Sequence, residues 1–428
     1  MKKKLLSLAL ILNTLIYAQE HYTVDELIIK SLENSPDLHI SQLNYNASEK
    51  RYDSAFSAYL PSIDISASVG QISQSATYNL PSADDTILIG KLSLKQIIYD
   101  FGKTGGETES RKFHSQSYKM ENMQKISNKK RDVKNAYYSV LKSLALIDVQ
   151  KENLKLNKSQ LYRAKRYFEA GIRTKIDVSD AEVQVIKAKL ELNKAEYNLK
   201  LSYAELDKVV GFTETLHEYT VFSKTLHLET LYDSLSPYNF NLKESIEFAY
   251  THRYEVKKEL ANIKMSQAQT STVNAEYFPS LYVTANYLSQ QADSYQIYIP
   301  ETKWDAMINL NWNLYKGGDT QAREEEKRIN SSISHAQLLH TKLLIKKNIT
   351  TAFINLYKIK DTLQLDQSLV KVSNEKFDQA SKRYEHGLSD YIELQEARQG
   401  YIDAKATLVV DYYNYYIAIA VLDNAIGK

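Results

Sequence analysis

Two pairs of acidic side chains follow glycines at matching places in the chain. The pairs are Asp177 and Asp180 after Gly171, and Glu393 and Glu396 after Gly387. Both pairs have a spacing of three residues, which places the two carboxylates of a pair on one face of a helix. Paired carboxylates attract cations, although acidic residues in a first helical turn also complement the helix dipole. The chemistry that these residues offer is electrostatic binding.

Motifs for catalysis and for cofactor binding are incomplete. The run Asp100-Phe101-Gly102 matches part of a kinase signature, but no glycine-rich loop or catalytic loop accompanies it. Gly102-Lys103-Thr104 matches the end of a phosphate-binding loop, but Ile97 replaces its first glycine. The chain has no cysteine and no HExxH pattern, which argues against metal sites, Cys nucleophiles and a lipid anchor. The sequence therefore predicts no enzyme, no metal site and no cofactor.

The N-terminus has the pattern of a secretory signal peptide. Three lysines at positions 2–4 precede an apolar run over positions 5–15, and Ala18 is the small residue expected at a cleavage site. Residues 1–18 are therefore predicted to be removed on export, with an uncleaved anchor helix as the alternative. The 54 Lys and Arg nearly balance the 52 Asp and Glu, which argues against a nucleic-acid partner.

The mature chain contains one unit twice. Tyr59-Leu60-Pro61-Ser62 returns 218 residues later as Tyr277-Phe278-Pro279-Ser280, and Glu169-Ala170-Gly171 returns 216 residues later as Glu385-His386-Gly387. We therefore predict a first repeat over 19–210, a connector over 211–240 and a second repeat over 241–428. Each repeat is expected to run helix, β-hairpin, helix, turn, helix.

Long helices are predicted where glycine and proline are absent, over 107–170 and 319–386. Shorter helices are expected over about 37–59, 175–210, 255–277 and 390–425. In the second long helix, apolar residues recur at alternating spacings of three and four from Ile349 to Tyr384, as in a coiled coil. Asp366 interrupts this seam, and Gln150 interrupts the equivalent seam of the first repeat. These interruptions indicate either a shared polar layer or tolerated surface positions.

Four segments alternate strictly between apolar and polar residues, which is typical of β-strands with one apolar face. They lie over about 62–70, 87–99, 280–288 and 302–315. Trp304 and Trp312 stand near the two ends of one apolar face, where the aromatic girdle of a membrane barrel would lie. Four strands cannot close a barrel, so a membrane role requires an oligomer, and three protomers would supply twelve strands. A half-buried soluble sheet is the alternative.

Together these features resemble the TolC-type outer membrane efflux proteins over residues 22–427. The resemblance is carried by the duplication, the Pro61 and Pro279 segments before the strands, the exits Tyr99-Asp100-Phe101-Gly102 and Tyr315-Lys316-Gly317-Gly318, and the two glycine turns. It implies an α+β membrane protein: a homotrimer with a twelve-stranded outer-membrane β-barrel that continues into a long periplasmic α-helical coiled-coil barrel. The implied location is the outer membrane of a Gram-negative bacterium.

The resemblance also implies a function and partners. The chain would be the passive exit duct of a tripartite efflux or type I secretion system, working with a periplasmic adaptor and an inner-membrane pump or ABC transporter. A periplasmic coiled-coil scaffold or adaptor without a pore is the alternative.

Individual residues receive roles from the same resemblance. Glu393 and Glu396 would form an acidic ring at the periplasmic entrance, and Tyr384 would hydrogen-bond Asp177 as an entrance latch. The turns at Gly171 and Gly387 would be the tips on which the adaptor docks. Ser389 stands where the family often has a second, basic latch residue. Arg173 is the candidate to replace it, with a solvated turn cation as the alternative.

Overall fold

The computed structural model describes residues 20–76, 82–213, 219–222, 230–235, 238, 241–292 and 301–428. The predicted signal peptide lies outside these residues. The chain forms two compact units. The first, the tip unit, comprises the described residues within Met1–Pro36, Asn128–Asn239 and Ala352–Asn424. The second, the sheet unit, comprises those within Asp37–Ser127, Phe240–Thr351 and Ala425–Lys428.

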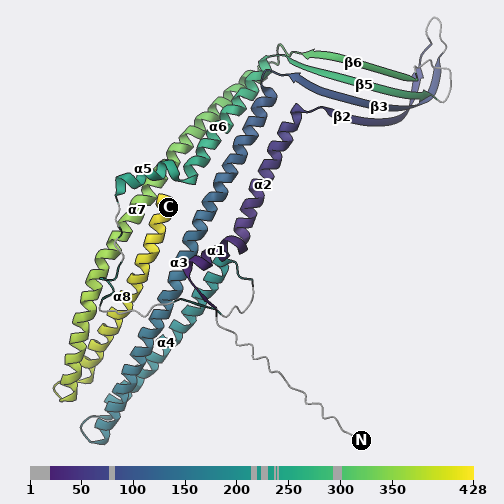
Figure 1. Ribbon diagram of the computed structural model, residues 1–428. Helices are drawn as coiled ribbons and strands as arrows, with labels where there is room; N and C mark the ends of the chain where they lie inside the picture. Colours follow the sequence, from purple (N-terminus) through teal and green to yellow (C-terminus); the bar gives the residue numbers. More distant parts are fainter. Residues whose placement is uncertain are drawn as a thin grey trace, which may run out of the picture. The chain divides into compact units, whose positions relative to one another are not determined.

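Within the described residues, each repeat has four α-helices where three were predicted (Figure 1). The first-repeat helices are α1 (Val24–Asn34), α2 (Pro36–Phe56), α3 (Lys103–Glu169) and α4 (Lys175–Val210). Their counterparts are α5 (Leu242–His252), α6 (Tyr254–Asn274), α7 (Asp319–Glu385) and α8 (Tyr391–Ile426). Helices α1 and α5 were not predicted. No helix in the described part of the chain has a segment long and apolar enough to cross a membrane.

The tip unit is built on the predicted apolar seams. Two short strands, β1 (Glu20–Tyr22) and β4 (Tyr219–Val221), pair in parallel beside its main core. That core joins residues of α3, α4 and α8, among them Val133, Val140, Leu206, Val210, Ile402 and Val409. The seam of α7 is buried at Ala352, Leu356, Leu363, Val370, Phe377, Ala380 and Tyr384. The 3/4 spacing therefore marks the packed face of this helix, as predicted.

The polar interruption at Asp366 is buried rather than exposed. This side chain is 7% exposed, and its Oδ2 has no hydrogen-bond partner among the described residues. Burial, together with the charge of the neighbouring Asp411, raises the pKa of Asp366 to about 6. Asp366 and Asp411 therefore form a carboxylate pair in which burial makes Asp366 easier to protonate than a free aspartate.

We expect Asp366→Asn to stabilise the protein at neutral pH. A native pKa above the unfolded value of about 3.9 gives stability that is present below pH 4 and is lost as pH rises through about 6. The amide does not ionise, so the variant should avoid a loss of about 3 kcal/mol at pH 8. Thermal unfolding of both proteins at pH 5 and pH 8 measures this difference. Asp361→Asn, at an exposed position of the same helix, is the control. An unchanged pH slope in the Asp366 variant would contradict the assignment.

The sheet unit contains the four predicted strands in one antiparallel sheet of order β2-β3-β5-β6. They are β2 (Ser62–Gln74), β3 (Ala83–Tyr99), β5 (Ser280–Ala292) and β6 (Thr302–Asn311). The pairing of the two predicted hairpins is confirmed. Strand β6 ends earlier than predicted, so Trp312 lies beyond it. The indole Nε1 of Trp312 donates to the Tyr277 carbonyl at 3.0 Å, which holds this residue against the end of the preceding helical segment.

The strand register places the apolar side chains on one face of the sheet. Ile65, Leu92, Tyr287 and Trp304 lie opposite one another in one cross-strand row. The polar row Asp64, Ser93, Asn286 and Asp305 lies one position away, on the other face. Ile65 is 86% exposed and Trp304 is 77% exposed. An apolar face of this extent on a protomer marks a surface for lipid or for another protein.

A charged cluster holds the junction between the sheet and its helices. Glu276, at the end of the α6 segment, contacts Lys103 at 3.5 Å, Lys316 at 3.3 Å and Arg323. The hydrogen bond from Arg323 is the main cause that lowers the pKa of Glu276 to about 2. Because these cations belong to the starts of α3 and α7 and to the segment after β6, one carboxylate fixes how three segments meet.

Candidate functional site

The two turns that end α3 and α7 have the same conformation. Gly171 and Gly387 both have φ of +72°, the left-handed region that favours glycine. In the first turn the Ile172 amide donates to the Tyr167 carbonyl at 2.9 Å, and in the second the Leu388 amide donates to the Arg383 carbonyl at 2.8 Å. Both glycines therefore act as helix-ending residues, at the tips of the α3/α4 and α7/α8 hairpins (Figure 1).

Short polar side chains start the returning helices. Asp177 Oδ2 accepts from the Thr174 amide at 3.0 Å, and Thr174 Oγ1 accepts from the Asp177 amide at 3.4 Å, which is a capping box. In the second hairpin Asp390 Oδ1 accepts from the Glu393 amide at 2.9 Å. The carboxylate of Asp177 is therefore already engaged in capping α4.

Below the turns the four helices meet in an apolar cluster, which we call the tip cluster. Its buried members are Ala164, Ala181, Phe377, Ala380, Tyr384, Tyr391, Leu394 and Ala397. They come from α3, α4, α7 and α8, so the ends of the two hairpins are packed against each other within the protomer.

Arg173 connects the two turns. Its Nη2 donates to the carbonyl of Ser389 at 3.0 Å and to the carbonyl of Tyr384 at 3.4 Å. Its guanidinium carbon also lies 4.6 Å from the centre of the Tyr384 ring, within cation–π range. A second cross-hairpin contact joins Arg163 to Glu385. Arg173 thus bridges to the backbone at Ser389, the position for which it was the candidate replacement.

The Tyr384 hydroxyl does not bond Asp177 in this structure. Tyr384 is 1% exposed, and its hydroxyl has no hydrogen-bond partner among the described residues. Burial raises the pKa of this phenol, and the nearby Arg173 works in the opposite direction. Asp177 Oδ2 instead accepts hydrogen bonds from the amide and the hydroxyl of Thr174, so the predicted latch bond between Tyr384 and Asp177 is absent here.

The two predicted ring carboxylates have different surroundings. Glu393 pairs with Arg383 across the turn, with Nε and Oε1 3.1 Å apart. Glu396 is exposed and makes no ion pair with the part of the chain that the structure describes. Sequence reasoning missed Arg383, because a ten-residue separation across a turn has no sequence signature. Within one protomer, Glu396 is the carboxylate with more uncompensated charge.

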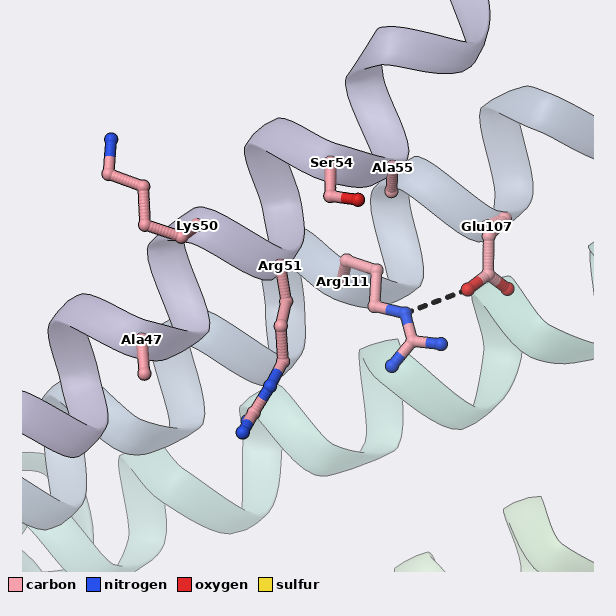
Figure 2. A pocket seen from close by; sticks show the side chains of 7 residues that line it. All are labelled: Ala47, Lys50, Arg51, Ser54, Ala55, Glu107 and Arg111. Carbon is pink, nitrogen blue, oxygen red and sulfur yellow. Dashed lines mark hydrogen bonds and ion pairs between the residues drawn. The ribbon is translucent and has the colours of Figure 1, made fainter.

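A groove elsewhere, between α2 and α3 in the sheet unit, is rich in cations (Figure 2). It has a volume of about 460 Å³ and is lined by Ala47, Lys50, Arg51, Ser54, Ala55, Glu107 and Arg111. Arg111 bonds Glu107 at 2.7 Å, and Lys50 pairs with Asp53 at 2.9 Å. The described residues contain no group of three or more side chains suited to hold a metal ion. The groove is largely charge-compensated, so the hairpin tips remain the candidate site.

Comparisons with known proteins agree with the fold. The family model described as "Outer membrane efflux protein" matches residues 27–212 and 246–428. The toluene efflux pump outer membrane protein TtgC of Pseudomonas putida is 21% identical over 94% of this chain and 82% of its own length. The outer membrane protein TolC of Vibrio cholerae is 22% identical over 99% of this chain and 95% of its own. The CmeC outer membrane channel of Campylobacter jejuni superposes with a TM-score of 0.82, at 16% identity, covering 94% of this chain and 85% of that one.

Proposed function

This chain belongs to the outer membrane efflux protein family, and on that premise we propose that three copies form a passive exit channel across the outer membrane. The main evidence for this proposal is the structure of the four-stranded sheet. Its apolar face is exposed on β2, β3 and β6 and at Tyr287 of β5, and among the described residues β2 and β6 each pair with one strand only. Backbone groups at such edges must be paired before a sheet can enter lipid.

Closure of a barrel by three protomers would give the backbone groups of both edge strands hydrogen-bond partners. Edge β2 of one protomer would pair with edge β6 of the next, and three four-stranded sheets would give a twelve-stranded barrel. Membrane barrels need at least eight strands, so one sheet is too small and three are sufficient. The helices that continue from the strands would then form a periplasmic tube with the same symmetry.

The hairpin tips would be the periplasmic entrance. Glu393 and Glu396 would contribute six carboxylates from three protomers, and such a ring favours cations. The turns at Gly171 and Gly387 would be the docking points for a periplasmic adaptor. We propose that the entrance latch at Tyr384 and Asp177 includes Arg173, which holds the first turn to the carbonyls of Tyr384 and Ser389.

The channel would act as part of a larger assembly. A passive duct has no energy source of its own, so an inner-membrane pump or ABC transporter must drive its cargo through an adaptor. The relative TtgC is named for toluene efflux, which favours efflux of small molecules over type I secretion for this chain.

Cell fractionation and native mass measurement test the assembly. We expect the protein in the outer-membrane fraction, and after detergent extraction we expect three copies per particle. The scaffold alternative expects a soluble periplasmic protein without a lipid-facing sheet. Recovery of the protein as a soluble monomer would reject the channel.

A further inference from the structure

Arg398 is the least exposed charged side chain in the described part of the chain, at 1%. Arginine is almost never buried to this extent unless a carboxylate or several carbonyls accept its hydrogen bonds. The residue lies on α8 beside Ala397 of the tip cluster. Its position continues the spacing of Tyr391 and Leu394, three and four residues apart, so it takes the place of an apolar seam residue.

No carboxylate or backbone carbonyl of the described residues accepts a hydrogen bond from this charge. The Nε and Nη1 groups of Arg398 have no hydrogen-bond partner among the described residues. Its favourable interaction is with the neutral hydroxyl of Tyr391, which belongs to the same helix and not to the other hairpin. Burial lowers the pKa of Arg398, as expected for a cation that has lost its water.

Two other buried cations show what a compensated site looks like in this chain. Arg253 donates to the Ala425 carbonyl at 2.9 Å and to Glu255 at 3.0 Å. Lys405, on the same helix as Arg398, pairs with Glu152. The absence of such partners around Arg398 is therefore particular to the tip cluster.

Arg398 lies on the face of α8 that packs toward the first hairpin, because Leu394, four residues earlier, belongs to the tip cluster and Lys405, seven residues later, pairs with Glu152 of α3. The tip cluster brings Ala164 of α3 and Ala181 of α4 against the α7/α8 hairpin that carries Arg398. Among the carboxylates at the start of α4, Asp177 caps the helix and Glu182 pairs with Lys165 at 3.0 Å. Asp180 is exposed and makes no ion pair with the described residues; its charge acts on Tyr391. Separating the hairpins would return water to the guanidinium.

We propose that Arg398 is a gating residue that favours opening of the entrance, because packing the two hairpins together buries its charge without supplying an acceptor. Its effect opposes that of Arg173, which gains hydrogen bonds when the same hairpins are together. The inference rests on the proposed channel function. The buried charge of Arg398 makes the closed entrance less stable than an apolar residue would. A docking partner therefore needs to supply less free energy to open it.

Substitution by methionine, which is unbranched and apolar, tests the inference by the sign of its effect. Arg398→Met should lower the open-to-closed ratio in bilayer recordings by about tenfold, since replacing a buried charge by a well-packed apolar group is often stabilising. It should also raise the thermal unfolding temperature of the purified protein. Arg398→Lys retains a buried charge and should give no such gain. Arg166→Met, at an exposed arginine of α3, is the control and should change neither quantity.

Changes in the opposite direction in the open-to-closed ratio or the unfolding temperature would overturn the proposal. If Arg398→Met opens the channel more often, unfolds at a lower temperature or fails to fold, the interactions of the arginine stabilise the packed tips. Failure of the proposed function gives a different result. In that case the wild-type protein conducts no current, while the unfolding temperatures of the Met and Lys variants still decide whether the buried charge is destabilising.

Discussion

Arg173→Ala is expected to open the entrance. The substitution removes two hydrogen bonds to carbonyls of the second turn and a cation–π contact with Tyr384. Partly exposed contacts of this kind contribute about 1–2 kcal/mol together, and each of three protomers would lose them. The open-to-closed ratio in planar-bilayer recordings should therefore rise by at least about tenfold.

Two further variants separate the parts of this latch. Arg173→Lys keeps the charge but loses the planar fork of donors, so it should fall between wild type and alanine. Tyr384→Phe keeps the ring under Arg173 and removes only the hydroxyl. A large effect of Tyr384→Phe would show that the hydroxyl reaches Asp177 in the trimer, whereas no effect would assign the latch to Arg173. Wild-type gating in Arg173→Ala would contradict the role of the arginine.

The double substitution of Glu393→Ala with Glu396→Ala is expected to abolish the cation preference of the channel. It removes six carboxylates from the proposed entrance ring, and polyvalent cations lose their binding site with them. The concentration of a trivalent cation that blocks half of the current should rise at least about tenfold. Reversal potentials in a salt gradient and block titrations measure the two effects.

The single variants should not be equal. Glu393 is paired with Arg383, so part of its charge is already compensated, and Glu396→Ala should have the larger effect. Glu375→Ala removes an exposed carboxylate from α7 at a distance from the turn and serves as the control. Unchanged selectivity and block in the double variant would show that these residues only complement the helix dipole.

Regular spacing made most of the fold predictable. Gly171 and Gly387 mark the C-terminal ends of α3 and α7, and strict alternation identifies the four strands, because both signals are local in the sequence. The start of α3 was predicted too late, at 107, because Gly105 and Gly106 lie inside its first turns. The 11-residue helices α1 and α5 were missed, since so short a segment carries little periodic signal. The early end of β6 was missed because alternation continues to Leu314 while the indole of Trp312 binds the Tyr277 carbonyl instead.

The site was predictable only in part. Gly171, Gly387 and the acidic residues near them follow from local sequence, whereas the caps at Thr174 and Asp390 were not predicted. The contact of Arg173 with the second turn joins residues more than 200 positions apart, and no local pattern indicates it. The burial of Arg398 likewise depends on four helices meeting in the tip cluster, so its sequence neighbours give no warning of it.

Single-channel recording of the detergent-purified protein in a planar bilayer tests the channel most directly. We predict small, cation-selective current steps from a preparation whose native mass corresponds to three copies. The steps should become larger or more frequent in Arg173→Ala. A preparation of folded protein that inserts into the bilayer but carries no current, or one that remains soluble without detergent, would contradict the proposed channel.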